Sequence, residues 1–101
     1  MRLDFSPRAV TDLQDILEYI GRDQPRAAVR LVDGIELTCR KLKDMPKVGT
    51  PRDDLYPGLR AFSHRKYVIY FLRPAEDVLR IVRIMHGARD VRSFDFRSSS
   101  T

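Results

Sequence analysis

YVIYFL (residues 67–72) and VLRIVRIM (residues 78–85) are the two stretches that decide the fold. The first is an unbroken run of β-branched, aromatic and aliphatic residues, the composition of a strand covered on both faces. The second is a similar run. The residues RPAED between them supply a hairpin turn, because Pro74 fixes φ and the acidic residues are readily solvated. A shorter strand at Leu59–Phe62 precedes them and is joined through Ser63–Arg65. We therefore predict a meander of three antiparallel strands.

Two amphipathic helices are predicted between an N-terminal strand at Arg2–Phe5 and the meander. Ser6 is suited to cap the first helix, and Pro7 to occupy its first position, where the missing N–H costs nothing. Gly21 ends this helix and a second begins near Pro25, so the short connection makes an antiparallel helical hairpin. The apolar stripes expected to face the sheet are Val10, Leu13, Ile16, Leu17 and Ile20, then Ala28, Leu31, Val32, Ile35, Cys39 and Leu42.

This order of elements defines an α+β fold. An N-terminal strand is followed by an antiparallel two-helix hairpin, packed on an antiparallel sheet that ends in the three-strand meander. Residues 45–58 contain three prolines and two glycines and form a loop. We expect a single domain over residues 1–96, an extended segment at 91–96, and a flexible tail at 97–101.

Some details of packing stay open in the sequence. Residues 67–71 are apolar on both parities, so both faces of the sheet are expected to be covered. Arg80 and Arg83 fall on opposite faces of the last strand, which leaves its inward parity undecided. Gly34, inside the second helix, either permits a close contact or is a tolerated defect.

Composition excludes several classes of protein. The 101-residue chain is 43% hydrophobic and 33% charged, and no run approaches the roughly 20 apolar residues of a membrane span. The single Cys39 excludes an intramolecular disulfide and a cysteine-based metal cluster, and its place on the apolar stripe predicts a core residue. The N-terminal residues enter the amphipathic pattern without a signal-peptide core, which predicts a cytoplasmic protein.

The net charge of +5 is confined to one part of the chain. Residues 1–58 carry ten Lys/Arg and ten Asp/Glu, residues 59–92 carry eight against three, and Asp95 and Arg97 cancel. Seven of those eight cations are arginines, which suit planar recognition of carboxylate or phosphate better than lysine does. This stretch is either an ordinary solvated sheet face or a surface for an anionic partner, and the balanced charge elsewhere favours the partner.

Three motifs together carry a family resemblance. The chain has FSPRAV-x-DL-x-x-I-x-x-YI from Phe5, P-x-x-G-x-PRDDLYPGLR from Pro46, and then YVIYF followed by LRIVRIMHGARD. In this order, over about residues 3–91, they resemble the RelE/ParE toxin superfamily. In detail they resemble its ParE branch, the plasmid-stabilisation toxins of bacterial type II toxin–antitoxin modules. The resemblance implies a RelE/ParE-like fold, no metal or other cofactor, and a cognate ParD-like antitoxin as partner.

The ParE branch implies a toxin that binds and poisons DNA gyrase and is held by its antitoxin in a hetero-oligomer. HGARD (residues 86–90) is the segment most typical of this branch, and Gly87 permits a sharp exit from the last strand. Arg89 and Asp90 either pair locally or contact the target. Direct binding of nucleic acid stays open. The target- or partner-binding candidates are Arg60, Arg65, Arg80, Arg83, His86 and Arg89.

A RelE-like, ribosome-dependent mRNA endoribonuclease is the alternative. It would need phosphate clamps and a proton-transfer group to activate a 2′-OH without a metal. Nucleases of this kind place a tyrosine or further basic groups near the end of the last strand. Here Gly87 and Ala88 stand there, and Tyr67 stands where some of them have arginine. The candidate clamps are Arg60, Arg65 and Arg83, and the candidate acid or base is His86.

Several of these polar residues also have a simpler structural interpretation. His86 is suited to tie the end of the last strand to the following loop, and His64 to serve as a turn residue. Asp53 and Asp54 are available as a general base, but their place in a proline-rich loop is typical of turn residues.

Overall fold

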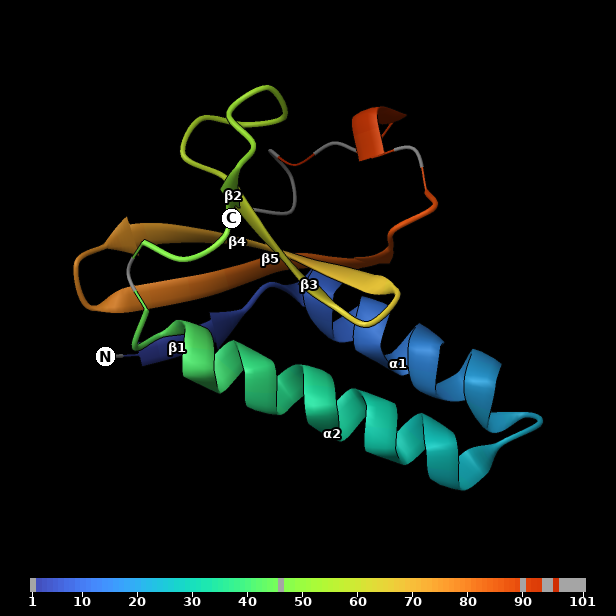
Figure 1. Cartoon of the computed structure of the whole chain (residues 1–101). Helices are drawn as coiled ribbons and strands as arrows, with labels where there is room; N and C mark the ends of the chain where they lie inside the picture. The colour runs from blue at the N-terminus through green and yellow to red at the C-terminus, as the bar shows by residue number, and fades with distance from the viewer. Residues whose placement is uncertain (1, 46, 90, 94–95, 97–101) are drawn as a thin grey trace.

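The computed structural model describes residues 2–45, 47–89, 91–93 and 96, and it contains two helices and one sheet (Figure 1). The elements follow the predicted order. In chain order they are β1 (Arg2–Phe5), α1 (Pro7–Gly21), α2 (Pro25–Leu42), β2 (Thr50–Pro51), β3 (Arg60–His64), β4 (Tyr67–Ala75), β5 (Val78–His86) and a 3-10 turn, η1 (Val91–Ser93).

The five strands form one sheet in the order β1-β5-β4-β3-β2. The meander β3-β4-β5 is antiparallel, as predicted, and β2 continues it as a two-residue edge strand. β1 pairs in parallel with β5, with Leu3 opposite Leu79, so the sheet is mixed where a fully antiparallel one was expected. The strands β1, β3 and β5 therefore run in one direction, and β2 and β4 run in the other. The α+β fold itself is confirmed.

Sequence signals at the start of α1 act as predicted. The Ser6 hydroxyl accepts a hydrogen bond from the backbone N–H of Ala9 at 3.0 Å, and Pro7 is the first helical residue. α2 also begins with a proline, Pro25, and the two helices lie side by side beneath the sheet in Figure 1. The helical hairpin therefore forms one layer and the sheet the next.

Both faces of the sheet are covered, but by different parts of the chain. Between the sheet and the helices lies the helix-side core, which includes Ile16, Ile35, Leu42, Ile69, Phe71, Leu79, Ile81 and Ile84. On the opposite face, the loop before β3 and the segment after β5 cover the loop-side core (Figure 1). Its buried members are Leu59, Tyr70, Val82, Met85 and Phe96.

A β-bulge decides which residues of β5 face the helices. Tyr70 lies opposite Arg83 while Phe71 lies opposite Ile81, so one extra residue of β5 sits between the two pairs. Ile81 and Ile84 therefore both reach the helix-side core although they are three residues apart. Strict alternation of inward and outward residues therefore could not have predicted which residues of β5 face the helices. Of its two arginines, Arg83 is 6% exposed, whereas Arg80 is only partly buried.

Side chains from α1 complete the outer edge of β5 where β1 ends. The Ser6 hydroxyl donates to the carbonyl of Val82 at 2.7 Å, and the Asp12 carboxylate accepts from the N–H of Ile84 at 2.8 Å. These bonds replace part of a missing strand ladder, since a buried backbone group left unpaired is costly. α1 is thereby held along β5.

Gly34 permits a close contact between α2 and β3. A Cβ at this position would lie 3.0 Å from Nε2 of His64, whose Nδ1 lies 3.0 Å from the hydroxyl of Thr38. His64 is therefore a strand residue packed on a helix, rather than a turn residue. The turn that follows consists of Arg65 and Lys66.

The second hairpin turn and the C-terminal segment differ from expectation. β4 extends to Ala75, leaving a two-residue turn before β5, because Arg73 donates to the carbonyls of Leu42 and Met45 and stays in the strand. Val91–Ser93 forms a 3-10 turn where an extended segment was predicted. The predicted tail at 97–101 lies outside the described residues.

Cys39 is a core residue, as predicted. It is fully buried on α2, and loss of solvation, reinforced by Glu36, raises the pKa of its thiol to about 12. The thiol therefore stays protonated and is not a nucleophile at neutral pH. Within the described ranges, neither helix is long and apolar enough to cross a membrane.

The face that α1 turns inward is not the full predicted stripe. Ala9 and Ile16 are buried, whereas Val10 and Leu17 are 42% and 40% exposed. The prediction that Val10 and Leu17 face the sheet is wrong. α1 is fixed by its bonds to the edge of β5, which turns one flank of the apolar stripe outward.

Two adjacent positions test this orientation. We expect Ile16→Asp to lower the free energy of unfolding by more than about 4 kcal/mol or to prevent folding, because it buries an unpaired charge. Leu17→Asp should cost less than about 1 kcal/mol, because its side chain meets water. Urea denaturation followed by circular dichroism measures both. Similar losses for the two variants would contradict the orientation of α1.

Candidate functional site

A broad cleft of about 890 Å³ opens on the face of the sheet that carries the loop-side core. Its walls are the loop before β3, the strands β3 and β4, and the segment after β5. Among the described residues that line it, three are arginines and one is an aspartate, so these side chains favour anions. The polar and charged residues that line it are Thr50, Arg52, Asp54, Ser63, Tyr70, Arg89 and Arg92.

Arg52 and Asp54 form a two-pronged ion pair in this cleft. Nε of Arg52 donates to Oδ1 of Asp54 and Nη2 to Oδ2, both at 3.0 Å. These hydrogen bonds from Arg52 hold the pKa of Asp54 below its usual range. The carboxylate therefore remains ionised at neutral pH. Asp53 has a different role, because its Oδ1 accepts from the N–H of Gly58 and closes the loop.

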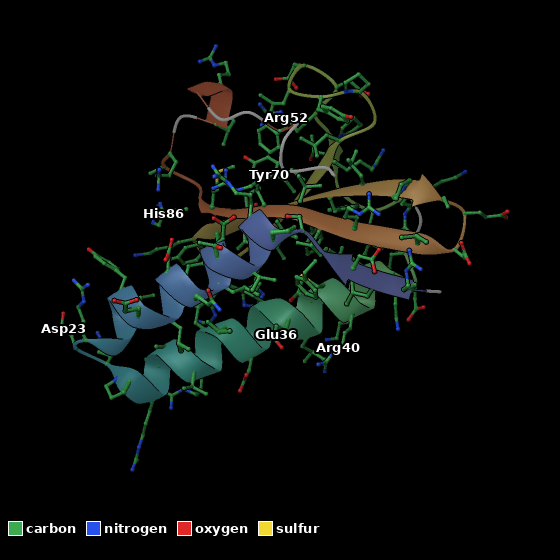
Figure 2. The ribbon with its side chains drawn as sticks, turned by 180° about the vertical axis from the view of Figure 1, so that it is seen from behind. Asp23, Glu36, Arg40, Arg52, Tyr70 and His86 are labelled. Atoms are coloured by element: carbon green, nitrogen blue, oxygen red, sulfur yellow. The ribbon has the colours of Figure 1, made fainter. Side chains whose placement is uncertain are left out.

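Tyr70 is another ionisable residue that lines the cleft. Its side chain is 3% exposed and packs on Phe96, with ring centroids 5.2 Å apart, and Figure 2 labels it beside Arg52. Burial raises the pKa of the Tyr70 phenol, and the neighbouring Arg52 guanidinium opposes this only in part. Asp54 and Tyr70 are thus shifted away from neutral pH in opposite directions. The cleft thus combines arginine side chains with an ionised carboxylate and a protonated phenol.

Arg60, predicted as a partner contact or phosphate clamp, ties the preceding loop to β3. Its guanidinium donates to the carbonyls of Lys47, Val48 and Gly49 at 3.1, 2.9 and 2.8 Å. Three backbone acceptors that would otherwise face only solvent are satisfied in this way. The side chain is therefore committed to the shape of the loop.

Arg83 and Arg80 are both paired with carboxylates. Nε and Nη2 of Arg83 donate to Asp12 at 2.8 and 3.0 Å, and both side chains are nearly buried. Arg80 lies three residues before Arg83 on β5, and its Nη2 lies 3.6 Å from the carboxylate of Asp4 on β1. The two arginines of β5 thus contact different neighbouring elements: Arg83 contacts α1, and Arg80 contacts β1.

His86 ties the end of β5 to the chain that follows. Nδ1 of His86 accepts from the N–H of Ala88 at 3.1 Å, and its ring meets the ring of Tyr67 edge-on at 5.4 Å. His86 is exposed and lines a smaller cleft of about 490 Å³ beside α1, with Arg83 and Arg89. It does not line the cleft of Arg52 and Tyr70.

The structure thus brings Arg83, His86 and Arg89 near one another but leaves Arg60, Arg65 and Arg80 elsewhere. Arg65 lies exposed in the turn between β3 and β4. Three residues of the broad cleft, Arg52, Tyr70 and Arg92, were not predicted from the sequence. Tyr70 was hidden inside an apolar strand, while the R-D-D sequence of the loop was a usable signal for an ion pair. Among the described residues, no group of three or more His, Cys, Asp or Glu is arranged to hold a metal.

Comparison with known proteins identifies the family. The model described as the ParE toxin of the type II toxin–antitoxin system parDE matches residues 3–91. Toxin ParE3 of Caulobacter vibrioides is 36% identical over 74 residues, which cover 73% of this chain and 70% of that protein. The chain belongs to the ParE toxin family. It is therefore the toxin of a type II toxin–antitoxin system, and an antitoxin is its implied partner.

A solved structure places this ParE-family toxin in the same fold. The structure, from the chromosomal ParDE toxin–antitoxin system of P. aeruginosa, aligns with a TM-score of 0.72 and 22% identity. The alignment covers 85% of this chain and 95% of the other. At this identity the likeness concerns the fold alone, and it confirms the arrangement of two helices on the sheet.

A pH titration of the ParE-family toxin tests the electrostatics of the cleft. We expect the Asp54 carboxylate, followed by carbon-13 NMR, to titrate below the ordinary value for aspartate, because Arg52 stabilises its ionised form. In Arg52→Gln the midpoint should return towards that ordinary value. An unchanged Asp54 midpoint in Arg52→Gln would contradict the assignment.

Proposed function

We propose that this toxin inhibits DNA gyrase in the cytoplasm and is neutralised by a ParD-like antitoxin. One observation carries the proposal. The side chains that a metal-free nuclease would need already make hydrogen bonds that hold parts of the fold together. Arg60 and Arg83 are held by structural hydrogen bonds, and His86 is hydrogen-bonded to the following turn. In the broad cleft, the pKa of Asp54 is lowered and the pKa of Tyr70 is raised, so both move away from neutral pH. Binding of a protein target accounts for such a surface better than general acid–base chemistry does.

An apolar groove on the helical hairpin is the proposed antitoxin site. It has a volume of about 380 Å³, and the exposed side chains of Val10 and Leu17 lie in it. Large apolar side chains in an exposed groove favour a lasting partner that covers them, since interfaces of obligate complexes are the more hydrophobic ones. An antitoxin that folds on binding would lay an apolar helix face here. The residues that line the groove are Phe5, Val10, Leu13, Gln14, Leu17, Val32 and Glu36.

Two assays on purified toxin separate the candidate targets. We expect inhibition of supercoiling by gyrase and intact mRNA on translating ribosomes. His86→Ala should keep the inhibition in protein that is folded by circular dichroism. His86→Gln is the matched control, because it keeps a hydrogen-bond acceptor for Ala88 but cannot shuttle a proton at neutral pH. Ribosomal mRNA cleavage that falls by roughly 10²–10⁴ in both variants would favour the nuclease instead.

The groove is tested by substitutions that leave the fold intact. We expect Leu17→Asp to weaken the affinity for the co-expressed antitoxin by about tenfold or more, because a charge replaces an apolar side chain that lines the groove. Thr11→Asp is the control, since Thr11 is exposed on the same helix but outside the groove. Isothermal titration measures both affinities. Equal affinity for Leu17→Asp and Thr11→Asp would remove the groove from the antitoxin interface.

A further inference from the structure

Three cations gather in a pocket of about 480 Å³ between the loop end of the helical hairpin and the β3–β4 turn. Arg30 comes from α2, and Arg65 and Lys66 are the two residues of the turn. We define these three as the cationic pocket. No acidic residue of the described ranges lines it, and its other lining residues are Ile20, Gln24, Ala27 and Leu31.

The cationic pocket differs from the sites at which an arginine of this molecule is paired. Arg2, Arg52, Arg80 and Arg83 pair with carboxylates, and Arg60 donates to three carbonyls. By contrast, the described part of the chain offers no hydrogen-bond or ion-pair partner to the side chains of the cationic pocket. Three like charges held together without a counter-charge repel each other, so an anionic partner gains from all three.

The backbone at Arg65 shows that its side chain is kept at a cost. Arg65 has φ +55°, and it is the only non-glycine residue with positive φ among the described residues. In a two-residue hairpin turn with positive φ at its first position, glycine is the favoured residue. An arginine here is strained, which is a feature found at functional sites. Glycine at this position would favour folding more than arginine does. We therefore attribute the presence of arginine to a role of its guanidinium group.

The floor of the cationic pocket narrows the class of partner. Ile20, Ala27 and Leu31 contribute apolar atoms to the same pocket as the three cations, and no aromatic side chain of the described residues lines it. Single strands of nucleic acid are typically held by phosphate contacts together with aromatic stacking platforms for the bases. An acidic protein segment with an apolar side chain between its carboxylates would pair with the three cations and pack on the apolar lining residues.

The cationic pocket and the antitoxin groove lie on opposite sides of α2. At 3.6 residues per turn, Val32 and Glu36 of the groove project away from Arg30 and Leu31 of the pocket. The apolar groove suits a lasting partner, whereas exposed charges steer a transient encounter and raise its rate. We propose that the cationic pocket is the target-contact site and binds an acidic, apolar-centred protein segment of the toxin's target. This inference rests on the proposed function for the assignment of the groove to the antitoxin.

Arg65→Gly is the decisive variant, because it removes the charge and relieves the strain together. We expect its Tm to rise by several degrees, while growth arrest on induction is lost and inhibition of gyrase weakens by at least about tenfold. Affinity for the antitoxin should stay within about twofold of the wild type, since the groove is untouched. Arg30→Glu and Lys66→Glu should reproduce the loss of growth arrest.

Arg40→Glu is the matched control, since Arg40 is an exposed arginine of α2 outside the pocket (Figure 2). Growth arrest by Arg65→Gly equal to that by Arg40→Glu would overturn the inference. So would a selective loss of antitoxin affinity, which would assign the pocket to the antitoxin. A wild type that arrests growth without inhibiting gyrase would instead defeat the proposed function, and the growth readout would still test the pocket.

A direct binding measurement tests the class of partner. The probes are a short fluorescent peptide with a central leucine between glutamates and a single-stranded DNA oligonucleotide of equal charge. We expect the wild type to bind the peptide more tightly, and Arg65→Gly to lose that preference. Tighter binding of DNA, weakened in Arg65→Gly, would overturn the assignment to a protein segment.

Discussion

The Asp12 carboxylate reaches across the open edge of β5, and the arrangement of the helices depends on that contact. One carboxylate accepts from Nε and Nη2 of Arg83 and from the backbone N–H of Ile84. Because both side chains are nearly buried, loss of either partner would leave an uncompensated charge, which typically costs about 3–5 kcal/mol. The contact also replaces a missing strand ladder beyond the end of β1. It fixes α1 lengthwise and in rotation against the sheet.

That rotation has a consequence for function. With Ile16 turned inward, Val10 and Leu17 project into the groove between the helices, where a free toxin exposes them to water. An exposed apolar groove favours aggregation of a chain that stands alone, but it provides a binding surface in a chain that has a lasting partner. Membership of a toxin–antitoxin family supplies such a partner. The stability of the fold and the surface for neutralisation thus come from the same placement of α1.

Arginine is used in two distinct ways in this toxin. Where it is partly or fully buried, as at Arg60 and Arg83, its fork of donors satisfies carbonyls or a carboxylate and fixes a loop or a helix. In the turn after β3, Arg65 contributes nothing comparable to the fold and carries a strained backbone. The excess positive charge of residues 59–92 is therefore a mixture of structural ties and surface charge. Counting charges along the chain cannot separate the two.

The sequence by itself determined the two helices, the strands β1, β3, β4 and β5, their order and the family, because capping residues, helical periodicity and apolar strand runs are local signals. It also placed Cys39 in the core and covered both faces of the sheet. Only the tertiary structure decided the parity of β5, because one bulge shifts Ile81 and Ile84 onto the same face. The same holds for the parallel pairing of β1. Which arginines are tied and which face solvent depends on carboxylates and carbonyls distant in sequence, as Asp12 is from Arg83. Spacing along the chain carries no trace of such contacts, so folding alone brings them together.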